Sequence, residues 1–130
     1  QSFNTHHKII VDSVKDQGPL RGIVDILNAT KADRILILAV DLPKISINFL
    51  GELIYAGCGT VPVHKNGMTE PLAAVYPRSM LPLAERNLSL KKFRMQDVVH
   101  EGIQERFLKE RPIGDSELHF FKNLNYQNNG

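Results

Sequence analysis

The stretch that most constrains the fold of this chain is an uninterrupted apolar run over residues 35–40, closed by Asp41 and Pro43. The run consists of isoleucine, leucine, alanine and valine, and no glycine or proline interrupts it. It is too short for a buried helix, and its residue types favour a strand that is buried on both faces, as in a parallel sheet. Asp41 is then expected at the carboxyl end of that strand.

Asp41 is the first candidate for a ligand-binding side chain, because open α/β sheets bind ligands in the crevice outside the carboxyl ends of their strands. A carboxylate there can hold Mg²⁺, a hard cation that prefers oxygen ligands and usually accompanies bound phosphates. The alternative is a loop carboxylate that only caps the following helix. The residues alone leave both interpretations open.

Strands and helices alternate through the first half of the chain. Residues 8–12 form a short β-branched run that ends in Asp12, so two strands of one sheet would each end in a carboxylate. An apolar face at helical spacing predicts a helix over residues 19–29, and Ser46 is a suitable N-cap for a helix over residues 47–56. This order predicts an α/β fold with right-handed crossovers and a parallel sheet.

Gly18, Pro19, Leu20 and Gly22 lie around the start of the first predicted helix. Pro19 suits the first helical position, and Gly18 permits a tight turn before it. Free backbone N–H groups at a helix start can bind anions or polar ligand edges, and Gly22 leaves room for a ligand or a neighbouring backbone. A plain turn between a strand and a helix accounts for the same residues without a ligand.

The second half of the chain is less regular. We expect Pro62 to confine residues 61–64 to an edge strand, because proline has no N–H group to donate to a neighbouring strand. Further along, the pattern predicts a buried strand at 72–76, a helix capped by Ser79 that runs to 88 and a second helix capped by Ser89 that runs to 99. It also predicts a short strand at 105–109 and a final strand at 118–121.

Asn123 and Asn125 follow the final predicted strand at alternate positions, which places both amides on the same side. Each amide can donate and accept hydrogen bonds, so the pair could fix a phosphate or a ring edge of a ligand. A pair of turn-forming asparagines is the alternative.

The composition is that of a single globular domain. Hydrophobic residues make up 42% of the 130 residues and charged residues 23%, which are ordinary values for a soluble protein with a core. A net charge of +2 gives no support for a nucleic-acid or membrane partner. Cys58 is the only cysteine, so we expect no intrachain disulfide and a reducing, cytoplasmic location. No apolar run approaches the roughly twenty residues of a transmembrane helix.

Five short motifs are spread over nearly the whole chain. They are IVDS at 10–13, GPLRG at 18–22, AVDLP at 39–43 followed by Ser46, EPLAAVYP at 70–77 and FFKNLN at 120–125. In this order and spacing they resemble the molybdenum cofactor guanylyltransferases, a branch of the nucleotidyltransferases. The resemblance implies a single nucleotidyltransferase domain over residues 1–130, with a Rossmann-like, three-layer fold and a mostly parallel sheet.

The resemblance also implies an activity, which is transfer of GMP from GTP to molybdopterin with release of pyrophosphate. It implies Mg²⁺ as the cofactor, bound together with the nucleotide by Asp41 as the catalytic residue. The resemblance places Asp12, Gly18, Pro19, Leu20 and Gly22 on the nucleotide side, and Asn123 and Asn125 on the pterin side. A molybdenum-cofactor accessory GTPase and a molybdoenzyme chaperone are the candidate protein partners.

The chain departs from this family in two places. The family opens with a strand and a glycine-rich loop that cradles the triphosphate, and no residues of this chain match them. We therefore expect a fold that is incomplete at the N-terminus, without its first βα units, and less stable for that reason. Tyr126, Gln127 and Asn128 stand where the family has Thr-Pro-Glu. A cytidylyltransferase or sugar-nucleotide transferase of the same fold is one alternative, and a non-catalytic nucleotide-binding remnant is another.

Overall fold

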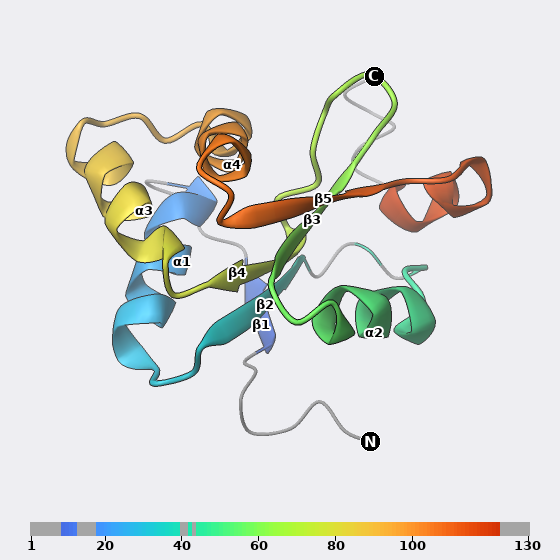
Figure 1. Ribbon diagram of the computed structural model, residues 1–130, viewed down its shortest axis with the longest axis horizontal. Helices are drawn as coiled ribbons and strands as arrows, with labels where there is room; N and C mark the ends of the chain where they lie inside the picture. The colour runs from blue at the N-terminus through green and yellow to red at the C-terminus, as the bar shows by residue number, and fades with distance from the viewer. Residues whose placement is uncertain (1–8, 13–17, 40–41, 43, 123–130) are drawn as a thin grey trace.

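The computed structural model describes residues 9–12, 18–39, 42 and 44–122, with the backbone alone for residues 9–12. Its elements, in chain order, are β1 (Ile9–Asp12), α1 (Gly18–Ala29), β2 (Arg34–Ala39), α2 (Ile47–Tyr55), β3 (Gly59–Val63), β4 (Ala73–Pro77), α3 (Met80–Ser89), α4 (Met95–Gln104), β5 (Leu108–Pro112) and the 3₁₀ helix η1 (Asp115–Phe121). Figure 1 shows these elements along the chain.

The described strands form one mixed sheet in the order β1-β2-β4-β3-β5. β1 is parallel to β2 and β3 is parallel to β5, whereas β4 is antiparallel to both of its neighbours. Four of the five described strands therefore point the same way, and β4 alone runs against them. The α/β class is confirmed. The expectation of a mostly parallel sheet is confirmed in that most strands point the same way, although β4 is antiparallel to both of its neighbours.

Helices cover both faces of this sheet, which gives the three layers that the resemblance implied. Figure 1 shows α1, α3 and α4 on one side of the strands and α2 with η1 on the other. Ile35 and Ile37 of β2 pack in the core under α1, α3 and α4, and Leu36 packs in the core under α2. All three side chains are at most 1% exposed, so the predicted two-sided burial of this strand is confirmed.

The prediction that Pro62 lies on an edge strand is wrong, because β3 lies between β4 and β5. The carbonyl of Pro62 accepts a hydrogen bond from the Glu70 N–H at 3.0 Å, so Pro62 faces the β4 side of its strand. On that side Thr60 pairs with Val75, but the next bridge joins Val63 to Thr69. The ladder between β3 and β4 is thus interrupted beside Pro62, where residues 71–72 form a turn, so no N–H is needed from the proline.

Three further boundaries differ from the predictions. Ser89 is the last residue of α3 rather than the cap of the next helix, since Lys91 has a positive φ of 60° and the chain turns there before α4 begins. The strand expected at 105–109 begins three residues later, as β5, because Arg106 has a φ of 66° just after α4. Residues 118–121 belong to η1 and not to a strand.

Arg111 of β5 contacts both η1 and α2. Its guanidinium donates to both carboxylate oxygens of Glu117, at 2.6 and 2.8 Å, and to both of Glu52 in α2, at 3.0 and 2.8 Å. It also lies 4.7 Å from the ring centroid of Phe49. Glu117 in turn accepts from the N–H of Gly114 at 2.9 Å, which closes a turn at the start of η1. These hydrogen bonds hold η1 against α2 and the sheet.

Arg78, just after β4, closes the loop between α1 and β2. Its guanidinium donates to the carbonyls of Leu27, Thr30 and Ala32 over 2.5–3.2 Å. Carbonyls near a helix end have no partner within the helix, and Arg78 supplies one from a distant part of the chain. The arginine therefore joins α1 to the start of β2.

Replacing Arg78 should lower stability because three half-buried carbonyls lose a charged donor. We expect Arg78→Met to reduce the free energy of unfolding by about 2–3 kcal/mol. Arg94→Met is the matched control, since Arg94 is exposed and makes one surface pair with Asp97 at 3.5 Å, worth about 0–1 kcal/mol. Urea unfolding followed by circular dichroism measures both, and equal losses would contradict the role given to Arg78.

The pair of Glu117 and Arg111 predicts a pH dependence of stability. Hydrogen bonds from Arg111 hold the pKa of Glu117 below its ordinary value of 4.5. A carboxyl whose pKa is depressed by folding stabilises the protein above its unfolded pKa, and this contribution is lost as the pH falls through the folded value. Wild type should therefore exceed Glu117→Gln in stability near pH 7, and the difference should shrink below about pH 4.5.

Glu105→Gln is the control for this measurement, because Glu105 is exposed. Thermal unfolding of the wild type and the two variants from pH 7 to pH 3 provides the comparison. A stability difference between wild type and Glu117→Gln that stays constant over this range would show that the ion pair does not stabilise the fold.

Candidate functional site

A cavity of about 400 Å³ lies at the carboxyl end of β2. β2 contributes its last residue, Ala39, and Leu42 lies just beyond it. The connection from β3 to β4 supplies most of the remaining wall, Gln96 of α4 closes one side, and Phe121 of η1 closes another. From that connection, the lining residues are His64, Asn66, Met68, Thr69, Glu70, Pro71 and Leu72. The cavity thus lies at the sheet edge where ligands of open α/β folds bind.

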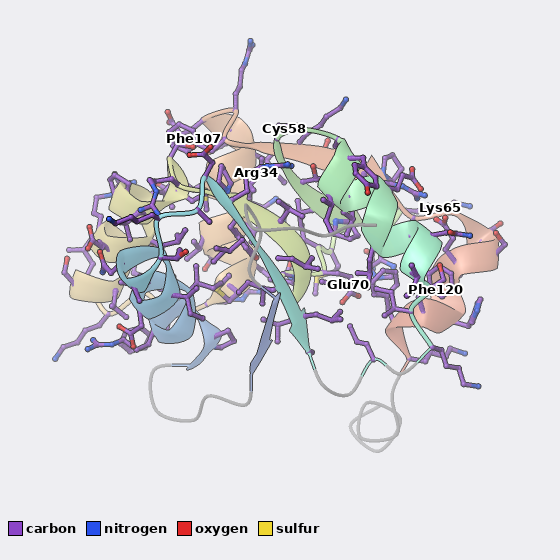
Figure 2. All side chains as sticks on the ribbon, turned by 90° about the horizontal axis from the view of Figure 1, so that it is seen from below. Arg34, Cys58, Lys65, Glu70, Phe107 and Phe120 are labelled. Atoms are coloured by element: carbon purple, nitrogen blue, oxygen red, sulfur yellow. The ribbon has the colours of Figure 1, made fainter. Side chains whose placement is uncertain are left out.

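Glu70 and His64 form a half-buried pair on the wall of this cavity. Nε2 of His64 lies 2.6 Å from Oε2 of Glu70, and the two side chains are 23% and 27% exposed. Burial raises the pKa of Glu70, and the hydrogen bond from His64 opposes this shift. Figure 2 shows Glu70 on the side of the sheet where β2 ends, away from the edge that carries Arg34 and Cys58.

The segment that carries Glu70 is held in place by hydrogen bonds on each side. Oε1 of Gln96 accepts from both N and Oγ1 of Thr69 at 3.0 Å, and Nε2 of Gln96 donates to the Thr69 carbonyl at 2.9 Å. The Tyr76 hydroxyl donates to the Pro71 carbonyl at 2.6 Å, and Ala39 N–H donates to the Leu72 carbonyl at 2.8 Å. The wall is therefore attached by hydrogen bonds to α4, β4 and β2.

Three of the sequence motifs meet at this cavity. Ala39 and Leu42 flank Asp41 in the chain, and Glu70 belongs to the EPLAAVYP motif. Phe121 belongs to a third motif, and its ring lies edge-on to His64 with 5.8 Å between ring centroids. Residues from three distant motifs therefore line one cavity, which the sequence alone did not predict.

The structure describes only some of the residues that the sequence singled out. Asp41, Asn123 and Asn125 lie outside the described residues, so the roles expected for them stay predictions. The backbone of Asp12 pairs with that of Ala39 in the register of β1 and β2. The ends of these two strands therefore lie side by side at the sheet edge that borders the cavity.

The turn at the start of α1 differs in part from its predicted geometry. The helix begins at Gly18, which has a φ of 67°, rather than at Pro19. Leu20 is fully buried in the core, so only its backbone could face a nucleotide. None of the residues from Gly18 to Gly22 lines the cavity at the end of β2. A role for Gly18, Pro19, Leu20 and Gly22 in nucleotide binding stays a prediction.

Sequence reasoning missed His64, Gln96 and Phe121 as residues of a site. The one sequence signal that pointed to this region is the EPLAAVYP motif, which begins with Glu70 and for which the sequence analysis gave no chemical role. Within the described part of the chain, no cluster of three His, Cys, Asp or Glu side chains could hold a metal ion. In the same part, no helix has the length and apolar character needed to cross a membrane.

Comparison with known proteins agrees with the fold and the motifs. The family described as MobA-like NTP transferase domain matches residues 2–105. A probable molybdenum cofactor guanylyltransferase of Opitutus terrae is 35% identical over 114 residues, covering 83% of this chain and 56% of that protein. One of the same name from Methanosarcina mazei is 33% identical over 124 residues, covering 88% and 53%.

A solved structure gives the same result. The crystal structure of molybdopterin-guanine dinucleotide biosynthesis protein A from Archaeoglobus fulgidus has a TM-score of 0.64 and 26% identity, covering 82% of this chain and 55% of that chain. This chain spans about half the length of the curated relatives it matches. With 104 of its 130 residues matched by the family, the chain belongs to the MobA-like NTP transferase domain family.

Proposed function

We propose that the protein transfers GMP from GTP to molybdopterin, forming the guanine dinucleotide cofactor and releasing pyrophosphate. The observation that carries this proposal is the meeting of three family motifs at one cavity beyond the carboxyl end of β2. The family membership and the names of the relatives support the same chemistry. A cytidylyltransferase of the same fold is the second candidate, and nothing in the described residues favours it.

The proposed reaction needs no covalent enzyme intermediate. A phosphate oxygen of molybdopterin attacks the α-phosphorus of GTP, and the bond from that phosphorus to the bridging oxygen of the β-phosphate breaks. The nucleophile is ionised at neutral pH, because the second pKa of a phosphate monoester is about 6. The protein therefore contributes mainly by holding the two phosphates in line and by stabilising the charge of the transition state.

Asp41 is the residue that would hold Mg²⁺ in this scheme. A site built from one or two carboxylates together with substrate phosphates is typical for Mg²⁺, so the absence of a three-residue cluster among the described side chains does not conflict with it. A bound Mg²⁺ would neutralise negative charge on the phosphates. Ala39 and Leu42, the described neighbours of Asp41 in the chain, line the cavity.

The apolar lining would orient the substrate and exclude water. Leu42, Met68, Leu72 and Phe121 present carbon surface to the cavity, and Phe121 is itself packed edge-on against Phe49. An apolar wall with a few polar groups is the usual construction of a site for a ring-bearing ligand.

The first test is substitution of Asp41 in the full-length protein. We expect Asp41→Ala to reduce GMP transfer by at least about a hundredfold while the circular dichroism spectrum stays unchanged. The reason is that Mg²⁺ would lose its protein ligand and would no longer neutralise the charge on the phosphates. Asp33→Ala is the matched control, because Asp33 is exposed and immediately precedes β2 at its other end. Near-normal turnover of Asp41→Ala would reject the assignment, and better turnover with CTP than with GTP would reject the guanylyl reaction.

The second test concerns Asn123 and Asn125. If both amides bind the pterin substrate, each should contribute a hydrogen bond of about 0.5–1.5 kcal/mol. The double variant Asn123→Ala/Asn125→Ala should then raise the Michaelis constant for molybdopterin about tenfold or more, with little change in GTP affinity. Asn48→Ala on the exposed face of α2 is the control. Parallel losses for both substrates, with a lower melting temperature, would indicate a structural role instead.

A further inference from the structure

We propose that Glu70 is a specificity-determining residue that binds the N–H edge of a 2-amino-4-oxopyrimidine ring, and that His64 is its positioning residue. This inference rests on the proposed function, whose two substrates, GTP and molybdopterin, both contain such a ring edge. The ring presents a cyclic N–H and an exocyclic amine side by side, and a carboxylate can accept from both.

The cavity has the size and lining that a flat heterocycle requires. Its volume of about 400 Å³ falls in the range of about 300–1,000 Å³ that is usual for small-molecule sites. Leu42, Met68, Leu72 and Phe121 provide apolar walls, and the polar groups are grouped on the connection between β3 and β4 and on Gln96. A ring could therefore lie against carbon surface while one of its edges meets a polar group.

Among the described side chains that line the cavity, Glu70 is the one carboxylate, and it has an oxygen without a partner. Oε1 of Gln96 already accepts two hydrogen bonds from Thr69, and Oδ1 of Asn66 accepts from the Met68 N–H at 3.0 Å in the exposed turn. Oε2 of Glu70 is bound by His64, whereas Oε1 has no hydrogen-bond partner among the described residues. A half-buried carboxylate oxygen of this kind calls for a donor from a ligand or from water.

His64 holds the Glu70 carboxylate in one orientation. Its Nε2 makes the 2.6 Å contact, and its ring is packed edge-on against Phe121. The hydrogen bond also counteracts the effect of burial, which raises the pKa of Glu70. His64 thereby favours the ionised carboxylate, which is the form that accepts hydrogen bonds from two N–H groups.

The His64–Glu70 pair is not needed to hold the connection between β3 and β4 together. His64 N–H donates to the Met68 carbonyl at 2.8 Å, and Glu70 N–H donates to the Pro62 carbonyl at 3.0 Å. Thr69 is further attached to Gln96 by three hydrogen bonds. The backbone of this segment is thus closed without the two side chains, which leaves them available for a ligand.

The test compares rings that differ only in the exocyclic amine. The probes are GTP against inosine triphosphate, and pterin against 4-oxopteridine, with dissociation constants measured on the full-length protein. For one of the two pairs, we expect wild type to bind the amino-bearing ring about tenfold more tightly or better, as a hydrogen bond to a charged group predicts. The pair that shows this preference identifies the substrate whose ring occupies the cavity.

Three variants decide the roles of the residues. Glu70→Gln should reduce the preference for the amino-bearing ring to near one, and His64→Ala should reduce it several-fold while His64→Gln restores part of it. Glu110→Gln on the exposed side of β5 should leave the preference unchanged. A purely structural role for the pair would weaken binding of both rings equally and leave their ratio as in wild type.

An unchanged ratio for both probe pairs in Glu70→Gln would overturn the inference. Glu70→Asp serves as a second variant, because it keeps the charge but withdraws it by one methylene, and it should also lose the preference. The failure of the proposed function would look different: wild type would not transfer GMP at all, whatever the ring preference. Normal transfer together with an unchanged ratio in Glu70→Gln would refute the role of Glu70 alone.

Discussion

The two-sided burial of β2 is the constraint on which the rest of the structure depends. Ile35 and Ile37 pack under α1, α3 and α4, while Leu36 packs under α2. Each fully buried side chain of this size contributes about 1.5–3 kcal/mol, more than a typical single hydrogen bond, which contributes about 0.5–1.5 kcal/mol. β2 is also hydrogen-bonded between β1 and β4, so its carboxyl end has a defined position at the sheet edge.

The cavity depends on polar contacts that attach other segments to this strand. Gln96 attaches the segment around Thr69 to α4, and Arg111 attaches η1 to α2 through Glu117 and Glu52. Thr69 and Gln96 are 27 residues apart in the chain, and Glu52 and Arg111 are 59 residues apart. Apolar burial accordingly determines the layers of the fold, whereas these polar contacts determine which side chains reach the cavity.

Much of the fold could be predicted from local patterns. The apolar run before Asp41 predicted β2, the apolar face after Pro19 predicted α1, and Ser46 correctly marked the start of α2, where its side chain accepts from the Phe49 N–H. The failures share one cause. The run at residues 118–121 suits a strand and a 3₁₀ helix alike, and the contacts of η1 with Arg111 lie outside that run. Pro62 suggested an edge strand because the interruption of the ladder opposite it was not visible in the sequence.

The sequence by itself determined the α/β class, the order of the first elements and the family, because periodic burial and short motifs are local properties. Only the tertiary structure decided that β4 runs against its neighbours, that β3 lies inside the sheet, and that Glu70 and His64 meet beside Ala39. The physical reason is that strand pairing and side-chain pairs across the fold depend on contacts between distant residues. A local sequence pattern does not report the distances between residues that come together only when the chain folds.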